Sequence, residues 1–377
     1  MINDKLLEVF KELYGISDIP NYQRAHMLLE AILKEEPHNI EANIVLADMY
    51  ENGFFVEKSC EKAYDLYRKL LKFDNAKAYY KVANLVEKKC INDVDDYLGE
   101  GENGKESLTS EDIAYRYYVK SARLGSSEAL SKLGLIYEQG YLDTKIDIKS
   151  AYEMYEKSLK INKDNKLALN GMGNIYFNGS LFDCDYGKAA AFYMQAARFQ
   201  YPDALNNLGI CYEYGKGVKQ NYEKALECYH RAGVMNHSDG LANEGILTIK
   251  LTASSKSSPN LIKSFKLLNQ SLILNNNNKQ ASYYLGLLYE TGLDFLNLGT
   301  KLRQPYIAFL HYKRSAELGC LKAKTKVGLA VFNGIENVFH HDEEEGLRIL
   351  REAAEEGEAE AIECLDTLRI REKKMDD

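Results

Sequence analysis

Residues 204–237 read ALNNLGICYEYGKGVKQNYEKALECYHRAGVMNH, and this stretch decides the fold. It contains two segments with apolar residues at helical spacing, separated by a turn that reads GKG. In the first segment Ala204 is followed by Leu208, and in the second Ala225 is followed by Tyr229. This spacing places the apolar residues of each segment on one helical face, and the glycines reverse the chain between them. The stretch therefore predicts a helical hairpin.

The same pattern recurs along the chain, with small residues at the start of both helices. The first helix of each hairpin, helix A, has these anchors: Ala42, Ala78, Ala129, Ala168, Ala204, Gly240, Ala281, Ala323 and Ala361. The second, helix B, has these: Ala25, Ala63, Ala114, Ala151, Ala189, Ala225, Ser264, Ala308 and Gly346. Small side chains let two helix axes approach to about 8–10 Å, and a bulky neighbour fills the groove. The pattern predicts an all-α solenoid of about nine antiparallel hairpins.

Both ends of the chain fit this arrangement, and insertions fall at one kind of turn. Residues 3–14 supply an A helix for the first hairpin, and residues 358–372 form a single A helix that caps the last one. The connection from a B helix to the next A helix barely varies in length. The turn from helix A to helix B carries the insertions 91–110, 252–260 and 293–305. We therefore expect one solenoid over residues 1–377, with its insertions along one edge.

Composition and charge exclude several classes of function. The chain has 377 residues, 45% of them hydrophobic and 28% charged, which is typical of a folded protein. Its net charge of −8 disfavours binding to nucleic acid or anionic lipid, since both need clustered lysine and arginine. The N-terminal residues do not resemble a secretory signal, and no apolar stretch is long enough to span a membrane. We expect a cytoplasmic protein.

No motif in the chain indicates catalysis. The seven cysteines are an odd number, widely scattered and without a C-x-x-C pair, so we expect free thiols in a reducing compartment. The glycines around Lys216 lack the residue order that cradles phosphates. The sequence predicts no enzyme activity, no catalytic residue, no metal and no cofactor.

Residues 204–237 closely resemble a Sel1-like repeat, a relative of the tetratricopeptide repeat. The matching residues are Ala204, Leu208, Gly209, Tyr212, Gly215, Gly217, Val218, Lys224, Ala225, Tyr229 and Ala232. Similarity covers nearly the whole chain, with departures at 78–125, which carries the long insertion, and at 240–274, where Glu244 replaces an apolar residue. The longer connections between hairpins, which contain EEPHN and NKDN, look more like tetratricopeptide linkers.

The resemblance implies a right-handed solenoid that works as an interaction scaffold or adaptor. Such a protein binds a helix or an extended peptide of a partner on its concave surface, and it can be part of a larger complex. An alternative is a regulatory or accessory subunit of an enzyme complex, which a change in the turnover of a co-purifying enzyme would favour. A secreted branch of the family, to which hydrolase activity is ascribed, has paired cysteines within each repeat. That pairing is absent here, so we do not transfer the activity.

A set of glutamates follows the A-helix anchors at a constant offset, and we call it the glutamate column. Its members are Glu51, Glu87, Glu138, Glu213 and Glu290. If the A helices line the concave wall, this column forms an acidic stripe that attracts a basic peptide. Alternatively, glutamate simply suits a solvated helix end. Four more inner-wall residues are candidates for hydrogen bonds to a bound peptide, or else structural filler: Asn170, Asn174, Asn206 and Tyr283.

Overall fold

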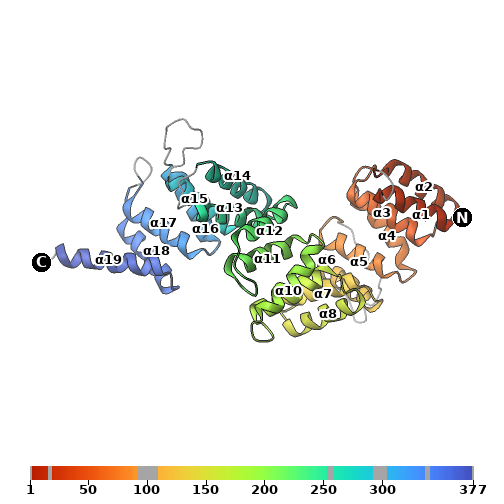
Figure 1. The fold of residues 1–377 in the computed structure, drawn as a ribbon, viewed down its shortest axis with the longest axis horizontal. Coiled ribbons are helices and arrows are strands. Elements are labelled where there is room, and N and C mark those ends of the chain that lie inside the picture. Colours follow the sequence, from red (N-terminus) through yellow and green to blue (C-terminus); the bar gives the residue numbers. More distant parts are fainter. Residues whose placement is uncertain are drawn as a thin grey trace. The chain divides into compact units, whose positions relative to one another are not determined.

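The computed structural model describes residues 2–15, 19–91, 109–252, 258–291, 304–335 and 340–375 (Figure 1). Within these ranges, side chains are not described for 2–3, 258–259 and 369–375. Most of the three predicted insertions lies outside the described residues, namely 92–108, 253–257 and 292–303. The chain divides into two compact units, Met1–Phe192 and Tyr193–Asp377.

The described residues form 19 helices, and the predicted all-α class of solenoid helix pairs is confirmed. The first unit contains α1 (Ile2–Tyr14), α2 (Tyr22–Glu35), α3 (Ile40–Asn52), α4 (Cys60–Leu71), α5 (Ala76–Glu87), α6 (Ser110–Arg123), α7 (Ser127–Gln139), α8 (Ile148–Ile161) and α9 (Lys166–Asn178). Helix α10 (Tyr186–Arg198) crosses the boundary between the units. The second unit contains α11 (Pro202–Tyr214), α12 (Tyr222–Val234), α13 (Ser238–Thr252), α14 (Ser258–Leu274), α15 (Lys279–Thr291), α16 (Pro305–Glu317), α17 (Leu321–Asn333), α18 (Glu343–Glu355) and α19 (Ala359–Met375).

Several A helices, including α3, α5, α7 and α9, start at a polar cap placed three residues before the anchor residue. In α3 the side chain of Asn39 accepts a hydrogen bond from the backbone N–H of Ala42 at 3.0 Å. In α5 Asn75 accepts one from Ala78 at 2.9 Å. Such caps satisfy backbone N–H groups that have no partner within the helix. At the other end of α3, Gly53 has a left-handed φ of 75°, which glycine adopts without steric cost.

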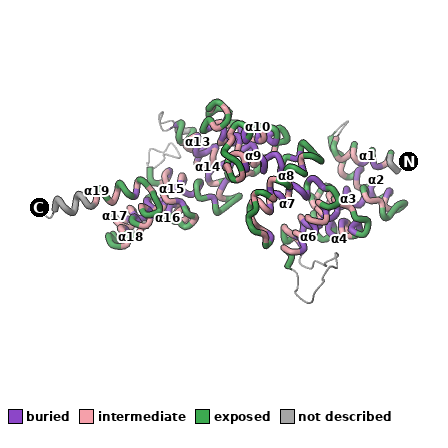
Figure 2. Tube along the Cα trace, turned by 90° about the horizontal axis from the view of Figure 1, so that it is seen from below, coloured by how far each residue is buried: buried purple, intermediate pink, exposed green. Residues whose placement is uncertain are grey.

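The predicted close approach of helices A and B is confirmed at the small residues. A Cβ atom built on Gly209 of α11 would lie 2.5 Å from Cε1 of Tyr229 in α12. On Gly134 of α7 it would lie 2.6 Å from the ring of Tyr155 in α8. Each tyrosine ring therefore occupies the space that a larger side chain on helix A would need. The buried positions appear in Figure 2 as short purple segments that recur along the helices.

In three hairpins a serine of helix B donates a hydrogen bond to a carbonyl at the start of its own helix A. The hydroxyl of Ser121 in α6 donates to the carbonyl of Ala76 in α5 at 2.7 Å. Ser158 in α8 donates to the carbonyl of Ser127 in α7 at 2.8 Å. Together with the ring packing, these bonds set the register of the hairpins that contain them. Of the helices described, none combines the length and the apolar character needed to cross a bilayer.

Candidate partner-binding surface

Every member of the glutamate column accepts a hydrogen bond from a tyrosine of the following B helix. Tyr118 donates to Glu87 at 2.6 Å, and Tyr155 donates to Glu138 at 2.6 Å. The remaining donors are Tyr67 to Glu51 at 3.2 Å, Tyr229 to Glu213 at 2.8 Å, and Tyr312 to Glu290. These tyrosines are the bulky B-helix residues that pack against the small positions of helix A. The column therefore forms part of the hairpin structure as well as part of its surface.

Lysines of the next A helix contact most members of the column. Within the first unit, Nζ of Lys81 lies 2.9 Å from Oε2 of Glu51, and Nζ of Lys132 lies 2.8 Å from Oε1 of Glu87. In the second unit, Lys250 lies 2.8 Å from Glu213, and Lys326 lies 3.9 Å from Glu290. These ion pairs are formed between A helices of successive hairpins. They offset much of the negative charge that the sequence places on this face.

Glu138 differs from the other members because its second partner is neutral. The side-chain amide of Asn174 in α9 donates to Oε1 of Glu138 at 3.0 Å. No lysine, arginine or histidine of the described chain lies within 4.0 Å of this carboxylate. Burial raises the pKa of Glu138, although the hydrogen bonds from Tyr155 and Asn174 act in the opposite direction. Its charge is therefore less well stabilised than it would be in water.

The other candidate residues lie mostly between helices. Asn170 in α9 is buried, and so is Asn206 in α11, whose side-chain oxygen accepts a hydrogen bond from Asn243 at 2.9 Å. Tyr283 in α15 is also buried, and its ring centroid lies 5.8 Å from that of Tyr312. These residues offer a partner much less accessible surface than the helix positions that face solvent.

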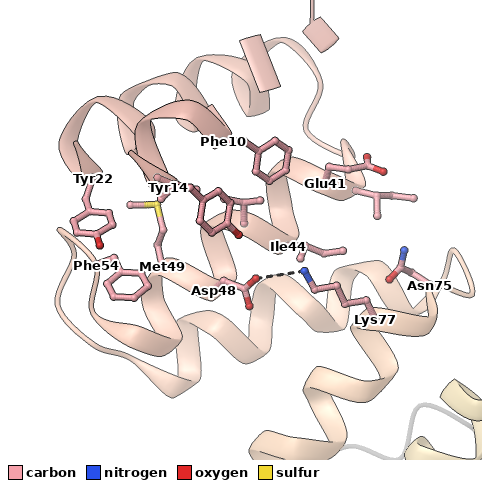
Figure 3. A pocket seen from close by; sticks show the side chains of 13 residues that line it. Phe10, Tyr14, Tyr22, Glu41, Ile44, Asp48, Met49, Phe54, Asn75 and Lys77 are labelled. Atoms are coloured by element: carbon pink, nitrogen blue, oxygen red, sulfur yellow. Dashed lines mark ion pairs between the residues drawn. The ribbon is translucent and has the colours of Figure 1, made fainter. Parts of the chain in front are cut away.

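A pocket on the A-helix side of the first unit was not predicted from the sequence. It has a volume of about 510 Å³ and lies between α1, α3 and the start of α5. Its lining residues are Phe10, Leu13, Tyr14, Tyr22, Ile40, Glu41, Ile44, Val45, Asp48, Met49, Phe54, Asn75 and Lys77. Figure 3 shows Phe10 and Tyr14 of α1 on one side and residues of α3 on the other, with Tyr22 and Phe54 at one end.

The walls of this pocket are apolar and aromatic, and polar groups lie at one edge. The rings of Tyr22 and Phe54 stack with their centroids 4.9 Å apart. Tyr14 is 71% exposed, so its ring is available at the rim. At the opposite end Nζ of Lys77 lies 3.5 Å from Oδ2 of Asp48 (Figure 3). An apolar cavity with a few polar groups at its edge is the usual form of a binding site in proteins.

Asp48 connects the pocket to the glutamate column. Its carboxylate lines the pocket, accepts a hydrogen bond from Tyr67 at 2.6 Å and lies 2.6 Å from Nζ of Lys81. Lys81 also contacts Glu51, one turn further along α3. The pocket and the first members of the column therefore belong to the same face of the first unit.

The repeats fall into a known family. The family model described as Sel1 repeat matches residues 40–71, 97–126, 127–160, 166–198, 202–237, 279–320 and 321–358. The chain belongs to the Sel1-repeat family. The matches to the Sel1 repeat leave out 238–278, which contains the whole of the predicted departure at 240–274. They also leave out 72–96, so the predicted departure at 78–125 is unmatched only in its first part. No curated protein matches this sequence.

Solved structures similar to this Sel1-repeat chain support the same fold. One is c5321, a protective antigen of uropathogenic Escherichia coli with an SLR fold, at 19% identity and a TM-score of 0.55, covering 96% of this chain and 70% of that one. A Sel1 repeat protein from Oxalobacter formigenes matches at 21% identity and a TM-score of 0.52, covering 65% of this chain and 94% of that one. The APC/C hetero-tetramer Cut9–Hcn1 matches at 19% identity and a TM-score of 0.54, covering 87% of this chain and 55% of that one. At these identities the likeness shows the fold alone.

In the unmatched stretch, Glu244 of α13 occupies a position that is apolar in the other repeats. It is 2% exposed, and Oε1 lies 2.7 Å from Nζ of Lys263 in α14. Its other oxygen lies 3.3 Å from Nδ1 of His230 in α12. The departure from the Sel1 pattern therefore introduces a buried carboxylate that side chains of two neighbouring helices contact.

Proposed function

We propose that this chain is a non-catalytic interaction scaffold that binds a helix or an extended peptide of a partner protein on its A-helix face. The observation that carries the proposal is the pocket between α1, α3 and α5, which combines apolar depth with a polar edge. The Sel1 repeat fold supports it because such repeats typically mediate protein–protein contacts. The protein acts in the cytoplasm, in keeping with its free, scattered cysteines.

In this proposal the partner inserts an apolar side chain into the pocket. Aromatic walls such as Phe10 and Phe54 provide the desolvated centre that anchors most interfaces. The polar edge at Asp48 and Lys77 fixes the orientation of the bound segment. The glutamate column lies along the rest of the same face, where lysines pair with Glu51 and Glu87 and offset their charge.

Site-specific photo-crosslinking tests the proposal. A photoreactive phenylalanine analogue is placed at Tyr14, at the pocket rim, or at Leu7, which lies on the same helix and is 54% exposed but does not line the pocket. The proposal expects a protein adduct from position 14 that position 7 does not give. The captured protein, once purified, should bind the wild type and lose about tenfold or more in affinity to Tyr14→Ala combined with Phe54→Ala. Equal crosslinking at both positions, or unchanged affinity, contradicts the proposal.

A further inference from the structure

The glutamate column of the first unit contains one position where a cation is missing. Glu51 and Glu87 each contact a lysine of the next A helix, at 2.9 and 2.8 Å. Glu138 has the same tyrosine partner geometry as Glu87, but the next A helix offers it the amide of Asn174 instead. Among the residues with described side chains, no basic group takes the place of the lysine.

The packing explains why α9 supplies no lysine from the position that α5 and α7 use. Lys81 and Lys132 stand three residues after the anchors Ala78 and Ala129. The equivalent position in α9 is Gly171, and a Cβ atom there would lie 2.2 Å from Cζ of Tyr155. Any side chain at this position would displace the ring that donates to Glu138. The chain therefore cannot place a lysine at the equivalent position without breaking the hairpin packing.

We propose that the missing cation comes from the partner, as a lysine or arginine side chain that pairs with Glu138 when a basic segment lies along α7 and α9. This inference rests on the proposed function and names the chemistry of the partner. The carboxylate has two oxygens and about four acceptor sites, of which Tyr155 and Asn174 use two. A charged donor from the partner therefore adds to these bonds and need not replace them.

Electrostatics favours a basic partner over an acidic or apolar one at this position. Burial raises the pKa of Glu138, so its ionised form carries an unmet cost that a nearby positive charge relieves. The position is only partly buried, which leaves a route from solvent. Charge-assisted hydrogen bonds between lysine or arginine and carboxylate are among the stronger contacts at interfaces.

A peptide experiment tests the inference. A library of short synthetic peptides with a fixed central lysine is screened against the full-length protein, and each selected peptide is compared with its norleucine counterpart, which lacks only the charge. The inference expects selected peptides to lose about tenfold in affinity on the change to norleucine, and a similar amount for Glu138→Gln. The matched control is Glu156→Gln, which removes the same charge from the exposed side of α8. It should leave the affinity unchanged.

A second variant tests the same site from within the chain. Asn174→Lys places an internal cation beside Glu138, so it should abolish binding of the selected peptides while helicity and melting temperature stay at or above those of the wild type. Peptides whose binding responds to Tyr14→Ala but not to Glu138→Gln or Asn174→Lys overturn this inference and leave the proposed function standing. A library from which nothing binds, under conditions where the protein is folded, counts against both.

Discussion

Tyr155 of α8 donates its phenolic hydrogen to Glu138 of α7 at 2.6 Å, and its ring packs against Gly134, four residues earlier in α7. One side chain thus supplies both the ring that fills the hairpin and the hydroxyl that holds the carboxylate. A buried hydroxyl needs such a partner, because leaving it unsatisfied costs more than the bond contributes. The same two roles fall to Tyr229 in the second unit, where it packs on Gly209 and donates to Glu213.

The close contact at Gly209 leads to the first prediction. Gly209→Ala should lower the free energy of unfolding by about 1–3 kcal/mol, because the new Cβ would lie 2.5 Å from the Tyr229 ring. Urea denaturation followed by circular dichroism measures the change. The matched control is Gly187→Ala in α10, where the nearest atom is 3.4 Å away, and it should be neutral or stabilising. If both variants are equally stable, the ring does not require the small residue.

A second prediction concerns the hydroxyl of Tyr229. Tyr229→Phe keeps the ring but removes the hydrogen bond to Glu213, which is 7% exposed and, among the described residues, keeps Lys250 as its charged partner. We expect a loss of about 1–3 kcal/mol in the free energy of unfolding, which is typical of a hydrogen bond to a charged group. Tyr306→Phe, at a residue that is 45% exposed, is the control and should have no measurable effect. Equal stability of all three proteins would show that the bond is not structural.

The third prediction is a pH dependence at Glu138. Burial raises the folded-state pKa of Glu138 above its ordinary value of 4.5, against the hydrogen bonds from Tyr155 and Asn174. A carboxyl group with a raised pKa contributes stability that is present below the ordinary value and lost as the pH rises through the folded-state value. Glu138→Gln should therefore gain stability relative to the wild type as the pH rises from about 4.5 through the folded-state pKa of Glu138. A constant difference across this range would contradict the prediction.

Asp48 should show the opposite dependence. Burial acts to raise its pKa, but the hydrogen bonds from Lys81 and Tyr67 and the charges of Lys81 and Lys77 outweigh it and hold the pKa below the usual 3.8. Such a group contributes stability above its usual value, and this stability is lost as the pH falls through the folded-state value. Asp48→Asn should therefore be most destabilising at neutral pH and should converge with the wild type below about pH 3.8. Acid titrations of the two proteins, followed by fluorescence of the tyrosines, measure this.

Glu244 allows a test of why one repeat departs from the family pattern. Glu244→Leu restores the apolar residue found at the equivalent position of most repeats, and it removes a buried carboxylate together with its desolvation cost. We expect stability equal to or greater than that of the wild type. Lys263→Met, which removes the ion pair at Oε1 and keeps the contact with His230, should instead lower the free energy of unfolding by about 1–3 kcal/mol. If Glu244→Leu were the more destabilising change, the ion pair would be a net source of stability.

The hairpins could be predicted from the sequence because their signal is local. Ala42 and Ala63 are small residues near the start of their helices, each followed four positions later by a bulky residue. Both alanines are fully buried in the structure. The glutamate column was also visible, since Glu51 and Glu87 recur at the same offset. In each case the information lies within one or two helical turns, where periodicity is informative.

The partners of the column could not be predicted in the same way. Three of the four lysines stand three residues after their anchors, but Lys250 stands ten residues after Gly240 and Asn174 stands six residues after Ala168. The repeat pattern therefore does not extend to every partner of the column. Which side chain faces a given carboxylate depends on how successive hairpins stack, and a single repeat pattern does not contain that information. The pocket was missed because its walls come from α1, α3 and α5 and not from one recurring position. Aromatic residues in the first hairpin, such as Phe10, are the sequence feature that could have indicated the pocket.

Lys132, which pairs with Glu87, belongs to the following hairpin. This ion pair therefore opposes the separation of two successive hairpins. Under a stretching force applied to the ends of the chain, such contacts would yield one after another, because each involves only neighbours. The contact at Glu138 has an amide in place of the cation, so we expect it to open at a lower force than the one at Glu87. The chain would then extend most easily between α7 and α9, where we propose that a basic partner binds.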